Sequence, residues 1–332
     1  MIGQETRDVE RKITAILKIL SDAQAPMGSR SISSLLEEQG IYLGERAVRY
    51  HLKIMDERGL TRSAGHKDGR TITVPGLEEL RNSLVTDKIG FVVSRIERMA
   101  YQTNVGLRSG TGRIPVDVSL FDRNQFPAAL KIMNAVFQAG LASSSMVALA
   151  GEGSNLGGIT VPEGQVGLAT VCNIAVNGCL LKSGIPVYAR FGGLLQIKSS
   201  LPFRFVDLVE FTGSTIDPSD IFIAGRMTDV LGAIGGNGKV LADYCEIPML
   251  SCSKADELLQ RMKNSGLITR AFLSRPGEKI YEIPFSPERA GLVTFSGLNA
   301  AAAAIESGVA VTNHSICGLL DVSRLRPFAE LL

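Results

Sequence analysis

The chain has 332 residues, enough for about two domains, and its 45% hydrophobic and 20% charged residues are typical of a soluble globular protein. Its formal net charge of +2 excludes a polycationic chain, so any contact with nucleic acid must come from a local basic patch. The N-terminus has no apolar segment of a signal peptide, and two long uncharged stretches (132–151 and 164–181) are too polar for a membrane span. We expect a cytoplasmic protein with no membrane segment.

The first 60 residues predict three short helices. Apolar residues recur at helical spacing over Val9–Ser21 and define the first helix. A break at a Pro-Met-Gly sequence follows, after which Ser29 or Ser31 can cap a second helix that ends at Gly40. The third helix lies within GERAVRYHLKIMDERGL, residues 44–60.

The third predicted helix has two faces. An apolar stripe, which must be buried, consists of Val48, Leu52 and Met55. A basic stripe on the other side consists of Arg46, Arg49 and Lys53. Gly59 ends the helix, because glycine takes up the left-handed conformation there without steric cost. In an isolated helix the basic stripe would be read as a solvated surface, so the neighbouring elements decide its role.

Two short extended runs follow, LTRS (60–63) and RTITV (70–74), separated by a turn at Asp68 and Gly69. Three helices and a hairpin is the order of a winged helix-turn-helix, whose third helix enters the major groove. The stretch 44–73 has seven Lys or Arg and four acidic residues, a larger positive excess than the whole chain. We therefore predict binding to a double-stranded DNA operator. A hairpin used only for protein contacts is the alternative.

The predicted DNA contacts divide by role. Arg46 and Arg49 would read base edges, while Lys53 and the hairpin residues Lys67 and Arg70 would hold phosphates. The full predicted set is Arg46, Arg49, Tyr50, Lys53, His66, Lys67 and Arg70. One winged helix covers too few base pairs for genomic specificity, so we also expect a homodimer.

Helical periodicity continues in LEELRNSL (77–84) and in IGFVVSRIERMAYQT (89–103). The latter carries an apolar stripe of Ile89, Val92, Val93, Ile96 and Met99. This stripe suits pairing with a partner helix, and packing against the chain's own C-terminal domain is an equally good use. We divide the chain into a winged helix over residues 1–85, a linking helix over 86–105 and an effector-sensing domain over 106–332.

The C-terminal region repeats itself. Residues 167–197 align with residues 291–322, and six identical residues coincide at a constant offset of 124. Each copy, about 115–210 and 240–332, predicts a strand, a helix, two strands, a helix and a strand. The predicted fold class is α/β (α+β overall): a winged helix followed by an internally duplicated α/β domain, with a cleft where the copies meet.

Motifs for catalysis, metal binding or phosphate binding are missing from the sequence. There is no GxSxG elbow, HExxH or Walker loop, and His314 is the only histidine of the C-terminal region. The glycine clusters at 151–158 and 234–239 fit hairpin turns better than phosphate-binding nests. The five cysteines have no CxxC spacing, and we expect them to be reduced and packed. The region predicts a sensor without catalytic residues, metal or cofactor.

Three stretches resemble the NrpR nitrogen-repressor family. They are TVCNIAVNGCLLKSGIPVYARFGGLLQI (170–197), FTGSTIDPSDIF (211–222) and the linking helix IGFVVSRIERMAYQT. With the winged helix in front, the resemblance covers nearly the whole chain. It implies a dimeric DNA-binding repressor of nitrogen-assimilation genes that is released from its operator by 2-oxoglutarate.

The internal repeat locates a candidate site for such an effector. A small dicarboxylate needs cationic groups or backbone N–H donors in a cleft, because burying an unpaired carboxylate is strongly unfavourable. At the offset of 124, Arg190 falls opposite His314 and Thr170 opposite Thr294. The predicted effector site consists of Thr170, Cys172, Arg190, Gly192 and Gly193, with Thr294 and His314 in the second copy. A structural salt bridge of Arg190 and a satisfied core histidine at position 314 are the alternatives.

Two other functions stay open on the residues alone. The first is an enzyme that acts on a small acidic metabolite and carries the winged helix as a regulatory or protein-binding appendage. The scarcity of general-base candidates argues against it. The second is RNA binding. Proteins that recognise single-stranded RNA stack its bases on exposed aromatic side chains, and the basic helix and hairpin lack a platform of such side chains, which disfavours this function.

Overall fold

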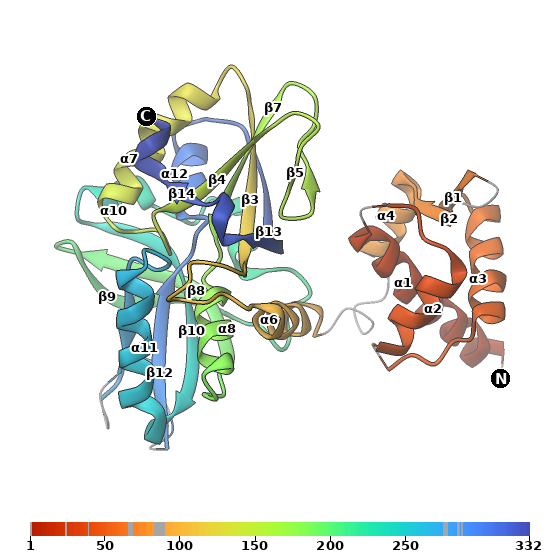
Figure 1. Cartoon of the computed structure of the whole chain (residues 1–332), viewed down its shortest axis with the longest axis horizontal. Helices are drawn as coiled ribbons and strands as arrows, with labels where there is room; N and C mark the ends of the chain where they lie inside the picture. Colours follow the sequence, from red (N-terminus) through yellow and green to blue (C-terminus); the bar gives the residue numbers. More distant parts are fainter. Residues whose placement is uncertain are drawn as a thin grey trace. The chain divides into compact units, whose positions relative to one another are not determined.

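The computed structural model describes residues 2–23, 25–38, 40–65, 69–82, 90–274, 278–283, 286 and 288–332 (Figure 1). The chain divides into two compact units, residues 1–89 and 90–332. Each unit has its own hydrophobic core.

The first unit is a winged helix-turn-helix, as predicted. Its helices are α1 (Ile2–Asp22), α2 (Ser29–Glu38), α3 (Glu45–Glu57) and α4 (Val74–Asn82), and its strands are β1 (Thr61–Gly65) and β2 (Gly69–Ile72). The apolar stripe of α3 packs into one cluster with Ile13 and Leu17 of α1 and Ile32 of α2. Gly59 follows α3 with a φ of 71°, the left-handed conformation expected of a glycine that ends a helix.

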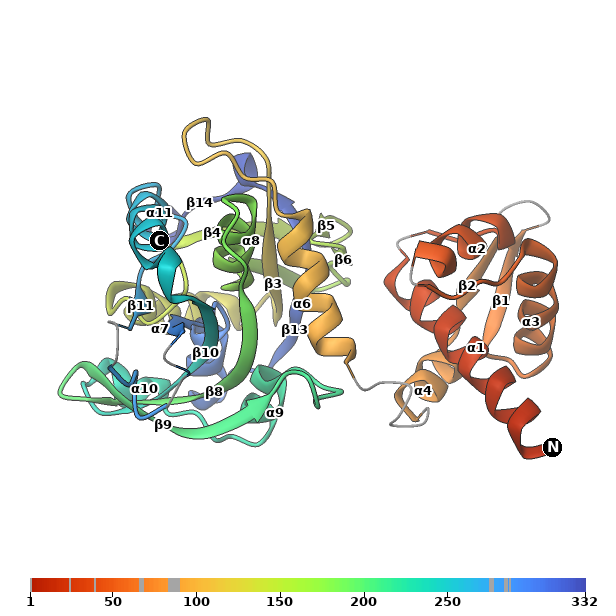
Figure 2. The same ribbon diagram turned by 90° about the horizontal axis from the view of Figure 1, so that it is seen from below.

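Helix α6 (Phe91–Gln102) opens the second unit and lies alongside α8 (Ile174–Lys182), as Figure 2 shows. Val92, Ile96 and Met99 are buried in a cluster with residues of the chain's own C-terminal domain. The sequence allowed this stripe to pair with a partner helix or to pack against the chain's own C-terminal domain. In the structure, these three residues pack against the C-terminal domain. Ile89 lies outside the described residues.

The second unit contains the predicted duplication. The first copy is β3 (Arg113–Asp122), α7 (Phe126–Gln138), β4 (Met146–Gly151), β7 (Gln165–Val171), α8 and β8 (Tyr188–Lys198). The second copy is β10 (Gly238–Pro248), α11 (Cys252–Asn264), β11 (Ala271–Leu273), β12 (Arg289–Phe295), α12 (Asn299–Glu306) and β13 (Val311–Asp321). Both follow the predicted order of strand, helix, two strands, helix and strand.

The copies exchange their last strands. One antiparallel sheet has the order β11-β12-β10-β8-β9, and the other has the order β13-β3-β7-β4-β14. Strand β8 of the first copy therefore pairs with β10 of the second, and β13 of the second pairs with β3 of the first. This exchange joins the two copies and brings their central strands to a shared junction.

The remaining elements are additions to the repeat. They are β5 (Asn155–Leu156), β6 (Ile159–Thr160), β9 (Leu201–Glu210), α9 (Pro218–Ala224), α10 (Val230–Ile234) and β14 (Arg326–Pro327), with short 3-10 turns at Met249–Ser251, Val322–Arg324 and Phe328–Leu331. Strands β5 and β6 pair across Gly157 and Gly158, whose φ angles of 57° and 93° suit a two-residue hairpin turn. The first glycine cluster thus forms the predicted turn. No helix in the described part of the chain is long and apolar enough to cross a membrane.

Candidate functional site

Helix α3 carries an exposed polar face, as its sequence predicts. Val48, Leu52 and Met55 are buried on the opposite side. The exposed face displays Arg46, Arg49, Tyr50 and Lys53, with Tyr50 62% exposed. This is the arrangement that a recognition helix requires, because side chains that read base edges must leave the helix on the side away from the core.

Two of the exposed cations have acidic neighbours one turn away. Arg49 lies 3.4 Å from Glu45 and Lys53 lies 3.9 Å from Glu57. Exposed pairs of this kind contribute little free energy. Both cations are therefore available to a phosphate or a base edge.

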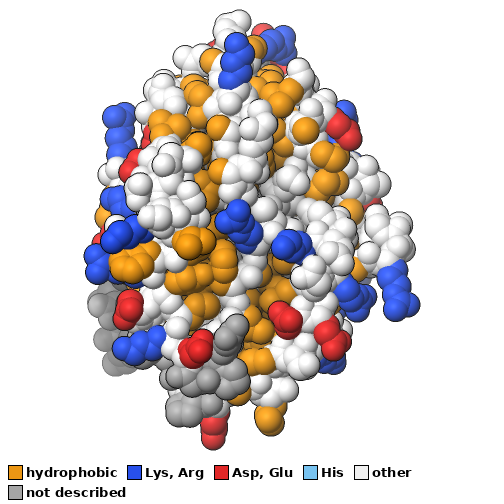
Figure 3. Space-filling model, turned by 90° about the vertical axis from the view of Figure 1, so that its left-hand side faces the viewer, with side chains coloured by type: hydrophobic (Ala, Val, Ile, Leu, Met, Phe, Trp, Pro, Cys, Tyr) orange, Lys and Arg blue, Asp and Glu red, His pale blue; other side chains and the backbone are white. Residues whose placement is uncertain are grey.

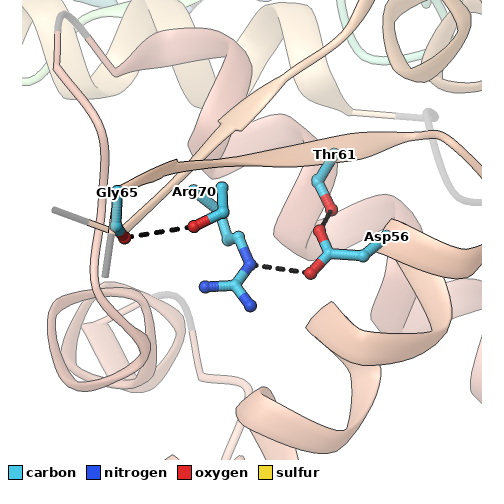
Figure 4. Close-up of polar contacts among 5 residues, drawn as sticks. Asp56, Thr61, Gly65 and Arg70 are labelled. Carbon is cyan, nitrogen blue, oxygen red and sulfur yellow. Dashed lines mark hydrogen bonds and ion pairs between the residues drawn. The ribbon is translucent and has the colours of Figure 1, made fainter. Parts of the chain in front are cut away.

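The wing is fixed to the recognition helix by an ion pair. Arg70 of β2 donates from Nε to Asp56 of α3 at 2.8 Å, and the Thr61 hydroxyl donates to the same carboxylate at 2.6 Å (Figure 4). Both partners of the pair are about two-thirds buried. The structure thus gives Arg70 a wing-to-helix contact, and its terminal N–H groups, which form no hydrogen bond or ion pair with the described residues, can make the predicted phosphate contact. His66 and Lys67 lie outside the described residues.

A small cavity lies at the junction of the two copies in the second unit. Its volume is about 10 Å³, room for about one water. Equivalent positions of the two copies line it: Asp117 of β3 and Asp243 of β10, and Cys172 after β7 and Ser296 after β12. The other lining residues are Asn173, Ile174, Asp217, Ser219, Leu298, Ser315 and Ile316.

The ends of two helices meet at this cavity. Helix α8 begins at Ile174 and α12 begins after Leu298, and neither has an acidic residue in its first turn. The Asn173 amide lies 3.4 Å from the Thr294 hydroxyl of the other copy. The positive ends of both helix dipoles therefore face the junction and favour an anion there.

The carboxyl groups at the junction hold their protons unusually well. Burial raises the pKa of Asp117 to about 7, although the carboxylate accepts a hydrogen bond from the Ile316 N–H at 2.8 Å. Burial, together with the nearby charge of Asp220, raises the pKa of Asp217 to about 6. The pKa of Asp243 is raised well above its ordinary value, again chiefly by burial. At neutral pH the junction therefore carries exchangeable protons.

One cation, Arg95, and one histidine, His314, are close to this acidic junction. The charge of Arg95, on α6, lowers the pKa values of Asp217 and Asp220 but does not offset their burial. Burial lowers the pKa of His314, and the Asp220 charge acts in the opposite direction. Asp220 also accepts a hydrogen bond from the Ser315 hydroxyl at 2.6 Å.

The structure brings part of the predicted effector site together. Cys172 lines the cavity, and Thr170 and Thr294 are buried directly opposite Asp117 and Asp243 on the neighbouring strands. His314 is half-buried on β13 and interacts electrostatically with Asp220. These residues approach the junction from both copies.

Arg190, Gly192 and Gly193 do not line the cavity, although Gly192 lies opposite Asp243 on the neighbouring strand. Arg190 is exposed on β8, with its guanidinium 5.6 Å from the Phe191 ring. A Cβ at Gly192 would lie 2.7 Å from Pro218, and one at Gly193 would lie 2.5 Å from the Asp207 carbonyl oxygen. These glycines permit close packing of β8 against its neighbours, because the exchanged strand is flanked by additional elements. They do not open space for a ligand.

The residues that the sequence analysis missed are the aspartates. Asp117 and Asp243 are single acidic residues within otherwise apolar stretches, VDVSL and LADYC. An isolated acidic residue in a strand that is otherwise apolar can indicate a functional site, because burying an unpaired carboxylate costs free energy. Within the described residues, no group of three or more His, Cys, Asp and Glu side chains is placed to hold a metal ion.

Comparison with known proteins adds the family. The model for NrpR regulatory domains NRD1 and 2 matches residues 89–327, and the model for the ribonuclease R winged-helix domain matches residues 14–80. The chain is 35% identical over 319 residues to the Global nitrogen regulator NrpRI of Methanosarcina mazei, an alignment that covers 96% of this chain and 98% of that protein. It is 31% identical to the Global nitrogen regulator NrpR of Methanococcus maripaludis, over 93% of this chain and 54% of that protein.

A solved structure has the same fold. The crystal structure of a nitrogen repressor-like protein from Methanococcus jannaschii matches with a TM-score of 0.60 at 18% identity, over 71% of this chain and 98% of that one. The chain spans about half the length of the Methanococcus maripaludis relative and nearly all of the Methanosarcina mazei relative. The regulatory-domain match and the near full-length identity lead to one conclusion: the chain belongs to the NrpR family.

Proposed function

We propose that this protein is a DNA-binding repressor of nitrogen-assimilation genes whose operator affinity is controlled by 2-oxoglutarate. The observation that carries the proposal is the exposed basic face of α3 on a winged helix, in a chain that also contains the family's regulatory domain. The names of its relatives favour a regulator over the alternative of an enzyme.

The junction of the two copies is the effector site that we favour. The positive ends of the α8 and α12 dipoles favour an anion, and a protonated Asp117 or Asp217 can donate a hydrogen bond to an effector carboxylate. A cavity of about 10 Å³ is too small for a dicarboxylate, so the effector can bind there only if the cavity enlarges. Effector binding would therefore move the walls of the cavity.

Helix α6 is suited to carry that movement towards the winged helix. Val92, Ile96 and Met99 pack in one cluster with Cys172, Ile174 and Ile316, which line the cavity. In the sequence, α6 is the first element after the winged-helix unit. A change at the cavity wall thus reaches the helix that leads to the DNA-binding domain. Coupling free energies of about 1–3 kcal/mol are typical of such regulation.

Operator binding tests the DNA-binding surface. We expect Arg49→Ala to weaken binding to the protein's own upstream DNA by about 1–3 kcal/mol and to relax discrimination at one base position. Lys131→Ala removes a cation from an exposed position on α7 and serves as the control. Equal operator affinity of the wild type and an Arg46/Arg49/Lys53→Ala triple variant would refute the assignment.

A titration with 2-oxoglutarate tests the effector. We expect it to lower operator affinity in a mobility-shift assay, and to do so less as the pH rises above 7, because the junction carboxyl groups lose their protons. Light scattering should give the mass of a homodimer, since paired half-sites require two winged helices. A monomer that binds its operator with full affinity would remove the dimer from the proposal.

A further inference from the structure

A second cavity lies away from the junction, at the ends of β8, β9 and β10. Its volume is about 430 Å³, within the range of small-molecule sites. Its lining residues are Gln196, Ile197, Lys198, Phe203, Arg204, Asp229, Asn237, Gly238 and Lys239. We call this cavity the basic groove. Much of it comes from the segment that connects the two copies.

The rim of the basic groove is held in place by backbone contacts. Ser199 and Ser200 form the turn between β8 and β9 with φ angles of 51° and 64°, a conformation that costs energy in residues other than glycine. The Ser199 N–H donates to the Asn237 side chain at 3.2 Å, and the Ser200 N–H donates to the Gly236 carbonyl at 2.9 Å. The hairpin is thus tied to the loop that begins β10.

The basic groove has an excess of positive charge. Lys198, Arg204 and Lys239 line it, and no ion pair joins any of the three to a carboxylate in the described part of the chain. Its one acidic residue, Asp229, accepts a hydrogen bond from the Gly232 N–H at 3.1 Å and so caps α10. The face of the regulatory domain in Figure 3 shows Lys and Arg side chains, together with some Asp and Glu, among exposed hydrophobic ones.

Two of these cations are held in position before any ligand arrives. The Lys198 ammonium lies 5.2 Å and the Arg204 guanidinium 5.4 Å from the centre of the Phe203 ring. Arg204 also donates from Nε to the Gln196 side chain at 3.2 Å, which orients its terminal N–H groups. Such preorganisation lowers the entropy cost of binding an anion.

We propose that the basic groove binds a small polyanion that carries a polyphosphate group, such as a nucleoside triphosphate. Three unopposed cations match several negative charges, and arginine and lysine side chains are the usual ligands of phosphate oxygens. An open groove suits phosphate, which keeps part of its hydration. The junction cavity has the opposite character, since four aspartates lie in or beside it. The two sites therefore take different ligands.

Calorimetry on the full chain tests this site with ATP, tripolyphosphate and orthophosphate as probes. We expect ATP and tripolyphosphate to bind, with orthophosphate weaker because it carries fewer charges. A Lys198→Gln/Lys239→Gln variant should bind both at least about tenfold more weakly. The control, Lys131→Gln/Lys263→Gln, removes two exposed cations from α7 and α11 and should leave the affinity unchanged.

The outcomes separate this site from the proposed function. If both double variants lose the same affinity for ATP, the anion is attracted non-specifically to surface cations and the proposal is overturned. The absence of measurable ATP binding to the wild type would also overturn it. Competition between 2-oxoglutarate and ATP, abolished by the groove variant, would also overturn it by making the groove the effector site. If 2-oxoglutarate fails to release the operator while ATP still binds at the groove, the proposed function fails and this inference stands.

Discussion

The two copies of the regulatory domain share a fold but differ where they meet. Asn173 follows β7 in the first copy, and Gly297 has the equivalent place in the second. The Asn173 amide reaches the Thr294 hydroxyl across the junction. The corresponding hydroxyl of Thr170 is buried without a hydrogen-bond partner among the described residues.

This difference makes the junction asymmetric. A Cβ at Gly297 would lie 2.8 Å from the Thr170 hydroxyl and 3.2 Å from an oxygen of Asp117, so that side has no room for an amide like that of Asn173. One side of the junction is filled and hydrogen-bonded, and the other keeps an unused hydroxyl beside a carboxyl group. A duplicated site that has lost its symmetry can bind one asymmetric ligand in a single orientation.

The largest expected effect comes from removing the Asp117 carboxyl group. Its pKa is about 7 in the folded protein against an ordinary 3.8, so the folded state binds more protons between these values and stability falls as pH rises through that range. Asp117→Asn removes this penalty. We expect its free energy of unfolding relative to wild type to increase by about 3 kcal/mol from pH 5 to pH 8, at about 1.4 kcal/mol per pKa unit.

Urea denaturation at the two pH values measures this difference, and Asp243→Asn sharpens the comparison between the copies. The pKa of Asp243 is also raised, so its substitution should act in the same direction. Asp122→Asn, at the exposed end of β3, is the control. A pH-independent difference between Asp117→Asn and wild type would show that the carboxyl group is ionised throughout.

The second prediction fills the small side of the junction. In Gly297→Ala the new methyl group would lie 2.6 Å from the Val171 carbonyl oxygen, a backbone atom that cannot rotate away. We expect a loss of about 1–3 kcal/mol in the free energy of unfolding. Gly213→Ala is the matched control, because a Cβ there meets nothing within 4 Å, and it should change stability by less than about 0.5 kcal/mol. A loss in Gly297→Ala that is as small as the change expected of the control would mean that the junction tolerates the extra volume.

The sequence predicted the winged helix from local periodicity and the repeat from identical residues at a constant offset. The stripes of α3 fix which residues are buried, and the offset of 124 aligns β7 with β12. Periodicity does not say what covers an apolar stripe, so the intramolecular packing of α6 stayed one of two alternatives. The offset also missed the pair Asp117 and Asp243, which are 126 residues apart.

The surroundings of the candidate effector residues were harder to predict, because they depend on the strand exchange. Aligning Arg190 with His314 assumed that equivalent residues of the two copies have equivalent surroundings. In the structure β8 lies between β10 and β9, whereas β13 is at the edge of its sheet. The additional strand β9 has no counterpart in the second copy. The two residues thus have different neighbouring strands, and their surroundings differ too: Arg190 is exposed, while His314 is half-buried near Asp220.

The smallest expected effect compares the two equivalent threonines directly. Thr294→Val removes the hydroxyl that lies 3.4 Å from the Asn173 amide and leaves a buried polar group without that partner. We expect it to cost about 1 kcal/mol in the free energy of unfolding. Thr170→Val removes a hydroxyl with no hydrogen-bond partner among the described residues, so it should be neutral or slightly stabilising. The two substitutions are chemically identical and both sites are buried, so each serves as the control for the other. Denaturation of both variants at one pH decides the matter. If Thr170→Val costs as much as Thr294→Val, the Thr170 hydroxyl has a partner such as a bound water, and the junction is more symmetric than its side chains indicate.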